Sequence, residues 1–183
     1  MAAQTNLLQP WPEVSKDNTI ESVYEKAHER AQELLPRFKS LLEPFVPSDS
    51  RLLTDIKSKN SFVRKHNRKQ ARKIHDVLRA AILTQTKDEA HNVAEKIKKA
   101  LKVVEFDFKE HPDQDVCATG YYGAFHIKIK LADMICEVQI MAETLWIYKE
   151  RSHASYTSQA AETDHSVQTF SNWLYNTADK ESA

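Results

Sequence analysis

The feature that most constrains the fold is a strict alternation of apolar and polar residues on both sides of Ala132-Asp133. The apolar positions before and after this pair are Phe125, Ile127, Ile129, Leu131, Cys136, Val138 and Ile140. Alternation with a period of two residues around a short polar break predicts a β-hairpin that buries one face. The rest of the chain then has to supply the elements that cover this face.

The same register predicts which polar side chains share the other face of the hairpin. It sets Lys128 opposite Glu137 and His126 opposite Gln139. One interpretation of this face is an exposed cross-strand ion pair. The other is a catalytic floor, because a Gly-Tyr-Tyr-Gly loop leads into the hairpin and a helix with Trp146, Lys149, Glu150 and His153 follows it.

The first helical pattern of the chain runs from Ile20 to Leu35. Pro36 is expected to end this helix or to start a second one, in which Phe38 and Phe45 continue the apolar stripe. These helices are expected to pack over the sheet.

The remaining elements alternate between helices and short strands. Helices are expected at about 61–73, capped by Asn60 or Ser61, and at about 87–101, 142–156 and from 164 onward. Strands are expected near 52–56, 77–84 and 103–108. This order predicts a single α+β domain with a mixed, mostly antiparallel sheet of four or five strands covered by helices.

Composition bears on the compartment and the partners. Lys and Arg number 26 and Asp and Glu number 26, so the overall charge indicates no partner. Cys117 and Cys136 lack metal-ligand spacing and are expected to be free thiols. No apolar run has transmembrane length and no signal-peptide pattern is present, so we expect no membrane contact and a cytoplasmic site of action. A host cytoplasm reached by non-classical secretion is the alternative.

Charge is concentrated in one segment. From Lys57 to Lys73 there are eight Lys or Arg residues and no acid. On a helix that begins at Ser61, positions 61, 64, 65, 68 and 72 share a face. Cations held this close repel one another unless an anion lies between them, and a helix start offers free N–H groups to a phosphate. A solvated basic face and a general RNA-binding patch are the alternatives.

Two carboxylates, Asp76 and Glu137, adjoin predicted strands. Mg²⁺ needs only one or two protein carboxylates when substrate phosphates complete its coordination. Two strand-borne acids beside a cationic helix therefore suit metal-assisted phosphoryl or pyrophosphoryl transfer. His75-Asp76 is also an HD dipeptide, so an HD-type metal phosphohydrolase is a weaker alternative. A site of that kind lies on helices, whereas here the dipeptide leads into a strand-like segment.

In combination these segments resemble the synthetase domain of the RelA/SpoT family, the nucleotide pyrophosphokinases that make alarmones such as (p)ppGpp. The similarity covers about residues 52–156 and is carried by IKSKNSFVRK, DVLRAAI, GYYGAFH and CEVQI, in this order. The resemblance implies that Lys57, Ser61 and Lys65 bind the donor phosphates. It also implies that Asp76 binds the metal and that Glu137 is the second catalytic carboxylate.

The resemblance extends to the residues around the two substrates. Arg64 and Arg79 are expected to assist donor binding. Tyr121 stands where the family has the tyrosine that stacks on the acceptor base. The other residues expected to bind the acceptor are His126, Lys128, Gln139 and His153.

The implied reaction uses ATP as the donor and Mg²⁺ on Asp76 and Glu137. An acceptor ribose 3′-hydroxyl attacks the β-phosphorus and AMP is released. The acceptor is a nucleotide, as in alarmone synthesis, or the 3′ end of tRNA or another RNA. Stand-alone members of the family include small synthetases and growth-inhibiting toxins, so a neutralising protein partner is a further expectation.

The predicted organisation has three parts within one domain. Residues 1–51 are an N-terminal arm and packing helices, 52–160 the synthetase-like core, and 161–183 a C-terminal helix and tail. Asp55 and Ala81 stand where the family has the two arginines that sandwich the donor adenine, and Met141 replaces a further arginine. These departures motivate a rival hypothesis, a catalytically degenerate module that binds a nucleotide or RNA on the same fold.

Overall fold

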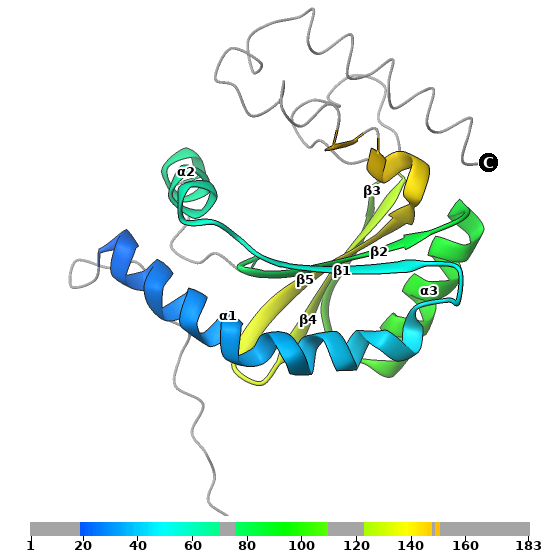
Figure 1. Cartoon of the computed structure of the whole chain (residues 1–183), viewed down its shortest axis with the longest axis horizontal. Helices are drawn as coiled ribbons and strands as arrows, with labels where there is room; N and C mark the ends of the chain where they lie inside the picture. The colour runs from blue at the N-terminus through cyan, green and yellow to red at the C-terminus, as the bar shows by residue number, and fades with distance from the viewer. Residues whose placement is uncertain (1–18, 70–75, 110–122, 148, 151–183) are drawn as a thin grey trace, which may run out of the picture.

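The computed structural model describes residues 19–69, 76–109, 123–147, 149 and 150, which form a five-stranded sheet with helices packed on it (Figure 1). The strands are β1 (Arg51–Ile56), β2 (Leu78–Thr84), β3 (Val103–Lys109), β4 (Ala124–Leu131) and β5 (Met134–Ala142). Their order across the sheet is β1-β2-β5-β4-β3. Strands β2 and β5 are parallel, and all other neighbours are antiparallel. The prediction of an α+β fold with a mixed, mostly antiparallel sheet is confirmed.

Helices α1 (Ile20–Leu42) and α3 (Lys87–Ala100) cover one face of the sheet (Figure 1). Each begins after a capping threonine: the side chain of Thr19 accepts from a backbone N–H of α1, and that of Thr86 does the same for α3. A short 3-10 helix, η1 (Glu43–Phe45), follows α1. Toward the other face, α2 (Lys59–Lys69) lies at one end of the sheet and the helical residues 143–147, 149 and 150 at the other (Figure 1).

The core follows the alternation of the two hairpin strands. The side chains buried beneath α1 and α3 include Phe125, Ile127, Ile129 and Leu131 of β4 and Met134, Cys136, Val138 and Ile140 of β5. Each large side chain buried in this way contributes about 1.5–3 kcal/mol. Cys136 is a free thiol, as predicted, and burial raises its pKa to about 12. The main apolar layer therefore lies on one side of the sheet. The other side carries the polar side chains and a smaller apolar cluster that includes Leu83, Met141 and Leu145.

The hairpin of β4 and β5 has the predicted register, with Lys128 opposite Glu137 and His126 opposite Gln139. Its turn is closed by Ala132, which has a positive φ of 54°. The next residue, Asp133, accepts from the guanidinium of Arg30 on α1, with Nε at 3.0 Å and Nη2 at 2.8 Å from Oδ1. A fork of two charged hydrogen bonds thus ties the turn to the covering helix.

Helix α1 passes through Pro36 and ends at Leu42, so the expectation that Pro36 ends or starts a helix is wrong. Proline removes one helical N–H. The neighbouring side chains Leu34 and Phe38 are buried on the sheet. Tertiary packing on both sides of the proline outweighs the local loss.

The start of α2 also differs from the expectation. The helix begins at Lys59, so Asn60 and Ser61 lie inside its first turn. The backbone N–H of Ser61 donates to Oγ of Ser58 at 3.4 Å, which makes Ser58 the capping residue.

The helix expected from residue 164, the tail and Cys117 lie outside the described residues. Within the described part of the chain, no helix combines the length and the apolar character needed to cross a bilayer.

Candidate active site

On the polar face of the sheet, one charged residue from each strand stands in a single row. In strand order, the row is Asp55, Arg79, Glu137, Lys128 and Glu105. The signs alternate, so every charge has an opposite charge on the neighbouring strand. Arg79 forms an ion pair with Asp55 at one end, and Nζ of Lys128 lies 2.5 Å from Oε2 of Glu105 at the other. Glu137 is the central residue of the row, and its carboxylate contacts His126 and Gln139 instead of a charged residue of the row.

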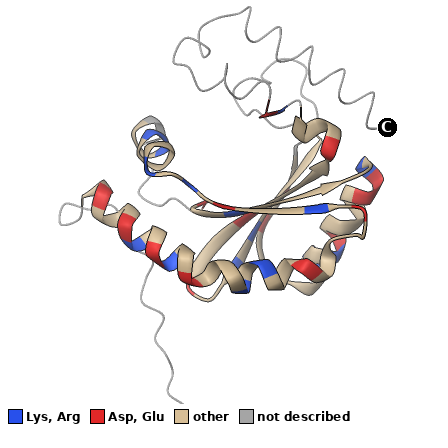
Figure 2. Cartoon of the chain, viewed as in Figure 1, with Lys and Arg blue, Asp and Glu red and all other residues tan. Residues whose placement is uncertain are grey.

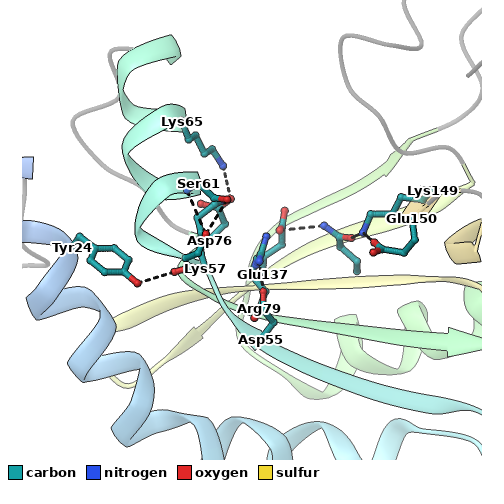
Figure 3. A network of polar contacts seen from close by, with 12 residues as sticks. Tyr24, Asp55, Lys57, Ser61, Lys65, Asp76, Arg79, Glu137, Lys149 and Glu150 are labelled. Carbon is teal, nitrogen blue, oxygen red and sulfur yellow. Dashed lines mark hydrogen bonds and ion pairs between the residues drawn. The ribbon is translucent and has the colours of Figure 1, made fainter. Parts of the chain in front are cut away.

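Beside this row, Lys57 and Lys65 donate to the same oxygen of Asp76 (Figure 3). Lys57 directly follows β1, Lys65 lies on α2, and Asp76 precedes β2. Nζ of Lys65 is 2.6 Å from Oδ2 of Asp76. We call these three residues the lysine–aspartate group. Of the cations predicted to converge on the helix face, Lys65 takes part in this group together with Lys57 from the end of β1, and the anion between the two is the chain's own Asp76.

Burial and charge act in opposite directions on Asp76. Only 9% of its side chain is exposed, and burial alone would raise the pKa of its carboxyl group. The two lysines outweigh burial and lower the pKa to about 2. The carboxylate is therefore ionised at neutral pH, although it is almost removed from water.

The first two helices hold the lysine–aspartate group in place. Phe62 of α2 is buried, and its ring packs edge-on against Tyr24 of α1 at 5.4 Å between centroids. The hydroxyl of Tyr24 donates to the backbone carbonyl of Lys57 at 3.2 Å. Along its described length α2 carries Lys and Arg and no acid (Figure 2). A cationic helix is thus fixed against α1 by an aromatic contact, and the same tyrosine holds the residue that follows β1.

Glu137 lies between the lysine–aspartate group and Lys149 (Figure 3). Its Oε1 is 3.5 Å from Nδ1 of His126, and its Oε2 accepts from Nε2 of Gln139 at 3.2 Å. Oε1 of Gln139 in turn accepts from Nζ of Lys149 at 3.3 Å. Burial opposes ionisation of Glu137, but the hydrogen bond and charge of His126 outweigh it, so the pKa of Glu137 lies below its ordinary value.

Asp76 and Glu137 are the two ionised carboxylates of the site, because the pKa of each lies below its ordinary value. The charge of Asp76 acts on the pKa of Glu137, so the two groups share one electrostatic environment. Oδ1 of Asp76 is buried, and no donor among the described residues reaches it. Such an oxygen is costly unless a cation or donor meets it. Among the described residues, no group of three or more His, Cys, Asp or Glu side chains could hold a metal ion.

The structure brings together, in two groups, six of the ten predicted site residues that it describes. Lys57, Lys65 and Asp76 meet directly, and His126 and Gln139 both contact Glu137.

Four other predicted residues have different partners or positions. Ser61 is hydrogen-bonded to Ser58, with 3.1 Å between the hydroxyl oxygens. Arg64 is exposed on α2. Arg79 is paired with Asp55, and Lys128 is paired with Glu105 instead of Glu137. Tyr121, His153 and His75 lie outside the described residues.

Two residues of the site were given no role in the prediction. Tyr24 belongs to an apolar helical stripe, and nothing in that stripe distinguishes a hydroxyl that supports Lys57. Lys149 follows the hairpin in a polar helix, but a sequence pattern does not reveal that its side chain is only 8% exposed. Its spacing of three residues from Trp146 is the one local signal, because Nζ lies 3.6 Å from the centroid of that ring.

The sequence matches no protein-family model and no curated protein sequence. The structure does match solved structures. Small alarmone synthetase 1 from Bacillus subtilis, bound to its product pppGpp, is 18% identical, with a TM-score of 0.59 over 86% of this chain and 90% of that chain. The same synthetase bound to AMPCPP is 17% identical, with a TM-score of 0.53 over 86% of this chain and 89% of that chain.

A third match is the complex between the Type VI effector Tas1 and its immunity protein. It is 18% identical, with a TM-score of 0.55 over 88% of this chain and 96% of the matched chain. At these identities the likeness shows the fold. The chain has the fold of the small alarmone synthetases, as the resemblance to the RelA/SpoT synthetase domain predicted.

Proposed function

We propose that this chain is a Mg²⁺-dependent pyrophosphotransferase that moves pyrophosphate from ATP to the 3′-hydroxyl of a nucleotide or of an RNA 3′ end. The observation that carries the proposal is the lysine–aspartate group beside Glu137 on a synthetase fold. Two buried or half-buried ammonium groups and two ionised carboxylates are the charges that phosphoryl transfer uses. The pppGpp and AMPCPP bound to a protein of this fold support nucleotides as the substrate class.

The donor phosphates bind along Lys57, Ser61 and Lys65 in this proposal. The side chains of Lys57 and Lys65 are held on Asp76 at 7% and 30% exposure, respectively, and are oriented before the donor arrives. Arg64 and Arg79 are the further candidates for donor contacts. To make such a contact, Arg79 has to break its ion pair with Asp55 or to bind Asp55 and the donor at the same time.

The acceptor binds on the β4 side of Glu137. Its 3′-oxygen attacks the β-phosphorus of ATP while the bond from that phosphorus to the oxygen bridging the α-phosphate breaks. AMP leaves with the bridging oxygen, and the hydroxyl proton passes to the carboxylate of Glu137. The acceptor-binding candidates are Tyr121, His126, Lys128, Gln139 and His153.

Asp76 and Glu137 are the residues proposed to hold Mg²⁺, which supplies charge neutralisation on the donor phosphates when it is bound. The protein's own contribution is alignment. Three separate segments fix Lys57, Lys65 and Asp76 before substrate arrives, so little reorganisation accompanies the reaction.

Other predictions go beyond what the structure tests. A protein that neutralises the activity is proposed as a partner, supported by the immunity protein in the Tas1 complex. Transfer RNA or another RNA is the alternative acceptor. A cytoplasmic site of action and the division at residues 51 and 160 also stay predictions.

The test is a transfer assay with Mg²⁺ and ATP labelled at the γ-phosphate. GDP, GTP, ADP, ATP and bulk tRNA are supplied separately as acceptors. We expect label on one class of acceptor with the wild type and a loss of at least about 1,000-fold with Asp76→Asn or Glu137→Gln, because either change removes a charge that the reaction uses.

A matched control is Glu105→Gln, which removes a carboxylate from the same row of the sheet at an exposed position. The control is expected to keep its transfer rate within about threefold, in line with small effects of exposed pairs. If Asp76→Asn and Glu137→Gln both transfer label at the wild-type rate, the proposed mechanism is ruled out.

The second candidate function is a nucleotide- or RNA-binding module without transfer. It is favoured by the pairing of Arg79 with Asp55, which occupies a residue expected to assist donor binding. Calorimetry with AMPCPP and Mg²⁺, and separately with tRNA, distinguishes the two candidates. Saturable binding with no transfer to any acceptor supports the module.

A further inference from the structure

A continuous chain of side chains on the polar face joins Lys149 through Gln139 to Glu137. Its two ends, Lys149 and Glu137, are labelled in Figure 3. Nζ of Lys149 donates to Oε1 of Gln139 at 3.3 Å, and Nε2 of Gln139 donates to Oε2 of Glu137 at 3.2 Å. Lys149 and Gln139 are both buried. A buried ammonium is therefore connected to the central carboxylate of the site through one side-chain amide.

The ammonium group of Lys149 and the carboxylate of Glu137 determine the orientation of the side-chain amide of Gln139 between them. An ammonium group only donates, and an ionised carboxylate only accepts. Lys149 therefore requires the carbonyl end of Gln139, and Glu137 requires its amino end. The amide can satisfy both in one orientation only, and the positive group polarises it toward stronger donation.

The result for Glu137 is that both of its oxygens are held. Oε2 accepts from Gln139, and Oε1 lies 3.5 Å from Nδ1 of His126. A carboxylate fixed at both ends presents its remaining lone pairs in one direction. An amide nitrogen carries two N–H groups, so Gln139 can contact Glu137 and a substrate at the same time.

The surroundings of Lys149 indicate that its charge is costly to keep. Burial lowers its pKa to about 8, even though the carboxylates of Glu150 and Glu137 act in the opposite direction. Its Nζ lies over the ring of Trp146, 3.6 Å from the ring centroid, in a cation–π contact. The same Nζ is 3.8 Å from Oε1 of Glu150, whose side chain is 55% exposed. A residue that served packing alone would not need a buried ammonium at this position.

We propose that Lys149 is a positioning residue, which orients the carboxylate of Glu137 for catalysis through the amide of Gln139. The inference rests on the proposed function, because Glu137 is the proposed base and metal ligand. Outer hydrogen-bond partners of this kind typically change activity or metal affinity about 10- to 100-fold when they are removed. Lys149 itself touches neither substrate in this proposal.

The first experiment needs no turnover. The side-chain amide of Gln139 is followed by NMR in ¹⁵N-labelled protein, and its signals are identified as those missing from Gln139→Ala. We expect protected, well-separated amide protons in the wild type and in Lys149→Arg. In Lys149→Met, which keeps the apolar stem on Trp146, we expect fast solvent exchange and collapsed proton shifts. Unchanged Gln139 signals in Lys149→Met overturn the inference.

The second experiment is a double-mutant cycle on transfer. Lys149→Met is expected to lower kcat about 10- to 100-fold with KM for ATP within about twofold, and Lys149→Arg to restore most of the rate. In the Gln139→Ala background the same change is expected to have no further effect. Additive losses mean that Lys149 acts by another route and also overturn the inference.

The control is Glu143→Gln, which removes a carboxylate at the start of the helical segment after β5, where its partner is Arg51 of β1. It is expected to leave both readouts unchanged. If no form of the protein transfers label while the NMR result is as expected, then the proposed function has failed and the placement of Gln139 by Lys149 has not. If transfer is observed and the NMR signals do not respond, the reverse holds.

Discussion

Asp55 on β1 and Arg79 on β2 face each other in the antiparallel register and form an ion pair on the polar face of the sheet. Asp55 is 62% exposed and Arg79 is 32% exposed. A pair this open to water is worth at most about 1 kcal/mol. A donor phosphate can therefore compete for the guanidinium at a small cost.

Asp55→Asn is expected to release Arg79 for the donor. Removing a competing pair of this strength is expected to lower KM for ATP about two- to fivefold, with kcat unchanged. Steady-state kinetics at low ionic strength measure the effect, which should shrink as salt is added. Arg79→Ala is the partner experiment and is expected to raise KM. If Asp55→Asn raises KM instead, Arg79 has no part in donor binding.

The acid stability of the metal-free protein is expected to depend on Asp76. Folding lowers its pKa from 3.8 to about 2, so the ionised form is favoured by the folded state. Its contribution, about 2 kcal/mol, is present above pH 4 and is lost as the pH falls toward 2. Urea unfolding of wild type and Asp76→Asn in the presence of a chelator, at pH values from 7 down to 2.5, measures this contribution. The stability gap between the two proteins should narrow with acid, and a constant gap would contradict the assignment.

Lys149→Met is expected to make the protein more stable at pH 7 while it slows transfer. Burial lowers the pKa of Lys149 from 10.5 to about 8, so the folded state disfavours its charge at neutral pH. Removing that charge gains stability, and leaving Oε1 of Gln139 without its donor costs part of it, for a net gain of about 1 to 2 kcal/mol.

The pH dependence of the unfolding free energy provides a second test of the same variant. Between pH 8 and 10.5 the unfolded chain holds more protons on Lys149 than the folded one, so wild-type stability should rise with pH in this window. The unfolding free energy of Lys149→Met should lack the part of this increase that comes from Lys149. Lys149→Arg, which keeps its charge over the same range, serves as the control. If Lys149→Met is less stable than wild type at pH 7, then Lys149 stabilises the fold and does not destabilise it.

Phe62→Ala is expected to loosen α2. The ring is 1% exposed and contacts Tyr24, so its removal leaves a cavity between α1 and α2 and costs about 3–5 kcal/mol. KM for ATP should rise as well, because Lys65 is carried by the same helix. Denaturant unfolding and kinetics test both effects. The matched variant is Phe108→Ala, whose ring is 40% exposed and which should lose far less stability.

Local pattern predicted the hairpin well, because alternation on both sides of a turn leaves one register that buries Ile127 and Val138 together. It could not predict the ion pair of Lys128. Register places Lys128 opposite Glu137, but the pairing of β4 with β3 offers Glu105 on the other side, and the side chain turns there. Which strand lies beyond the hairpin depends on contacts far apart in the sequence.

The same division holds for the candidate site. Lys57, Lys65, Asp76 and Glu137 were recognisable from the order and spacing of their segments. Their arrangement without a ligand could not be predicted, because a phosphate-binding motif does not indicate which groups its cations contact in the absence of phosphate. Here they contact Asp76. Lys149 was equally hidden, because burial of a lysine is a property of the assembled structure.

Strand β5 is the last described strand in the chain and the central one in the sheet. Before it is in place, β1 with β2 and β3 with β4 are two separate antiparallel pairs with no ladder between them. The joining step is the parallel pairing of β2 with β5, a contact of high sequence separation that forms slowly. Asp76 at the start of β2 and Glu137 in β5 therefore meet only when the sheet is complete. A nascent or partly unfolded chain has no assembled site, so any consumption of ATP is tied to the end of folding.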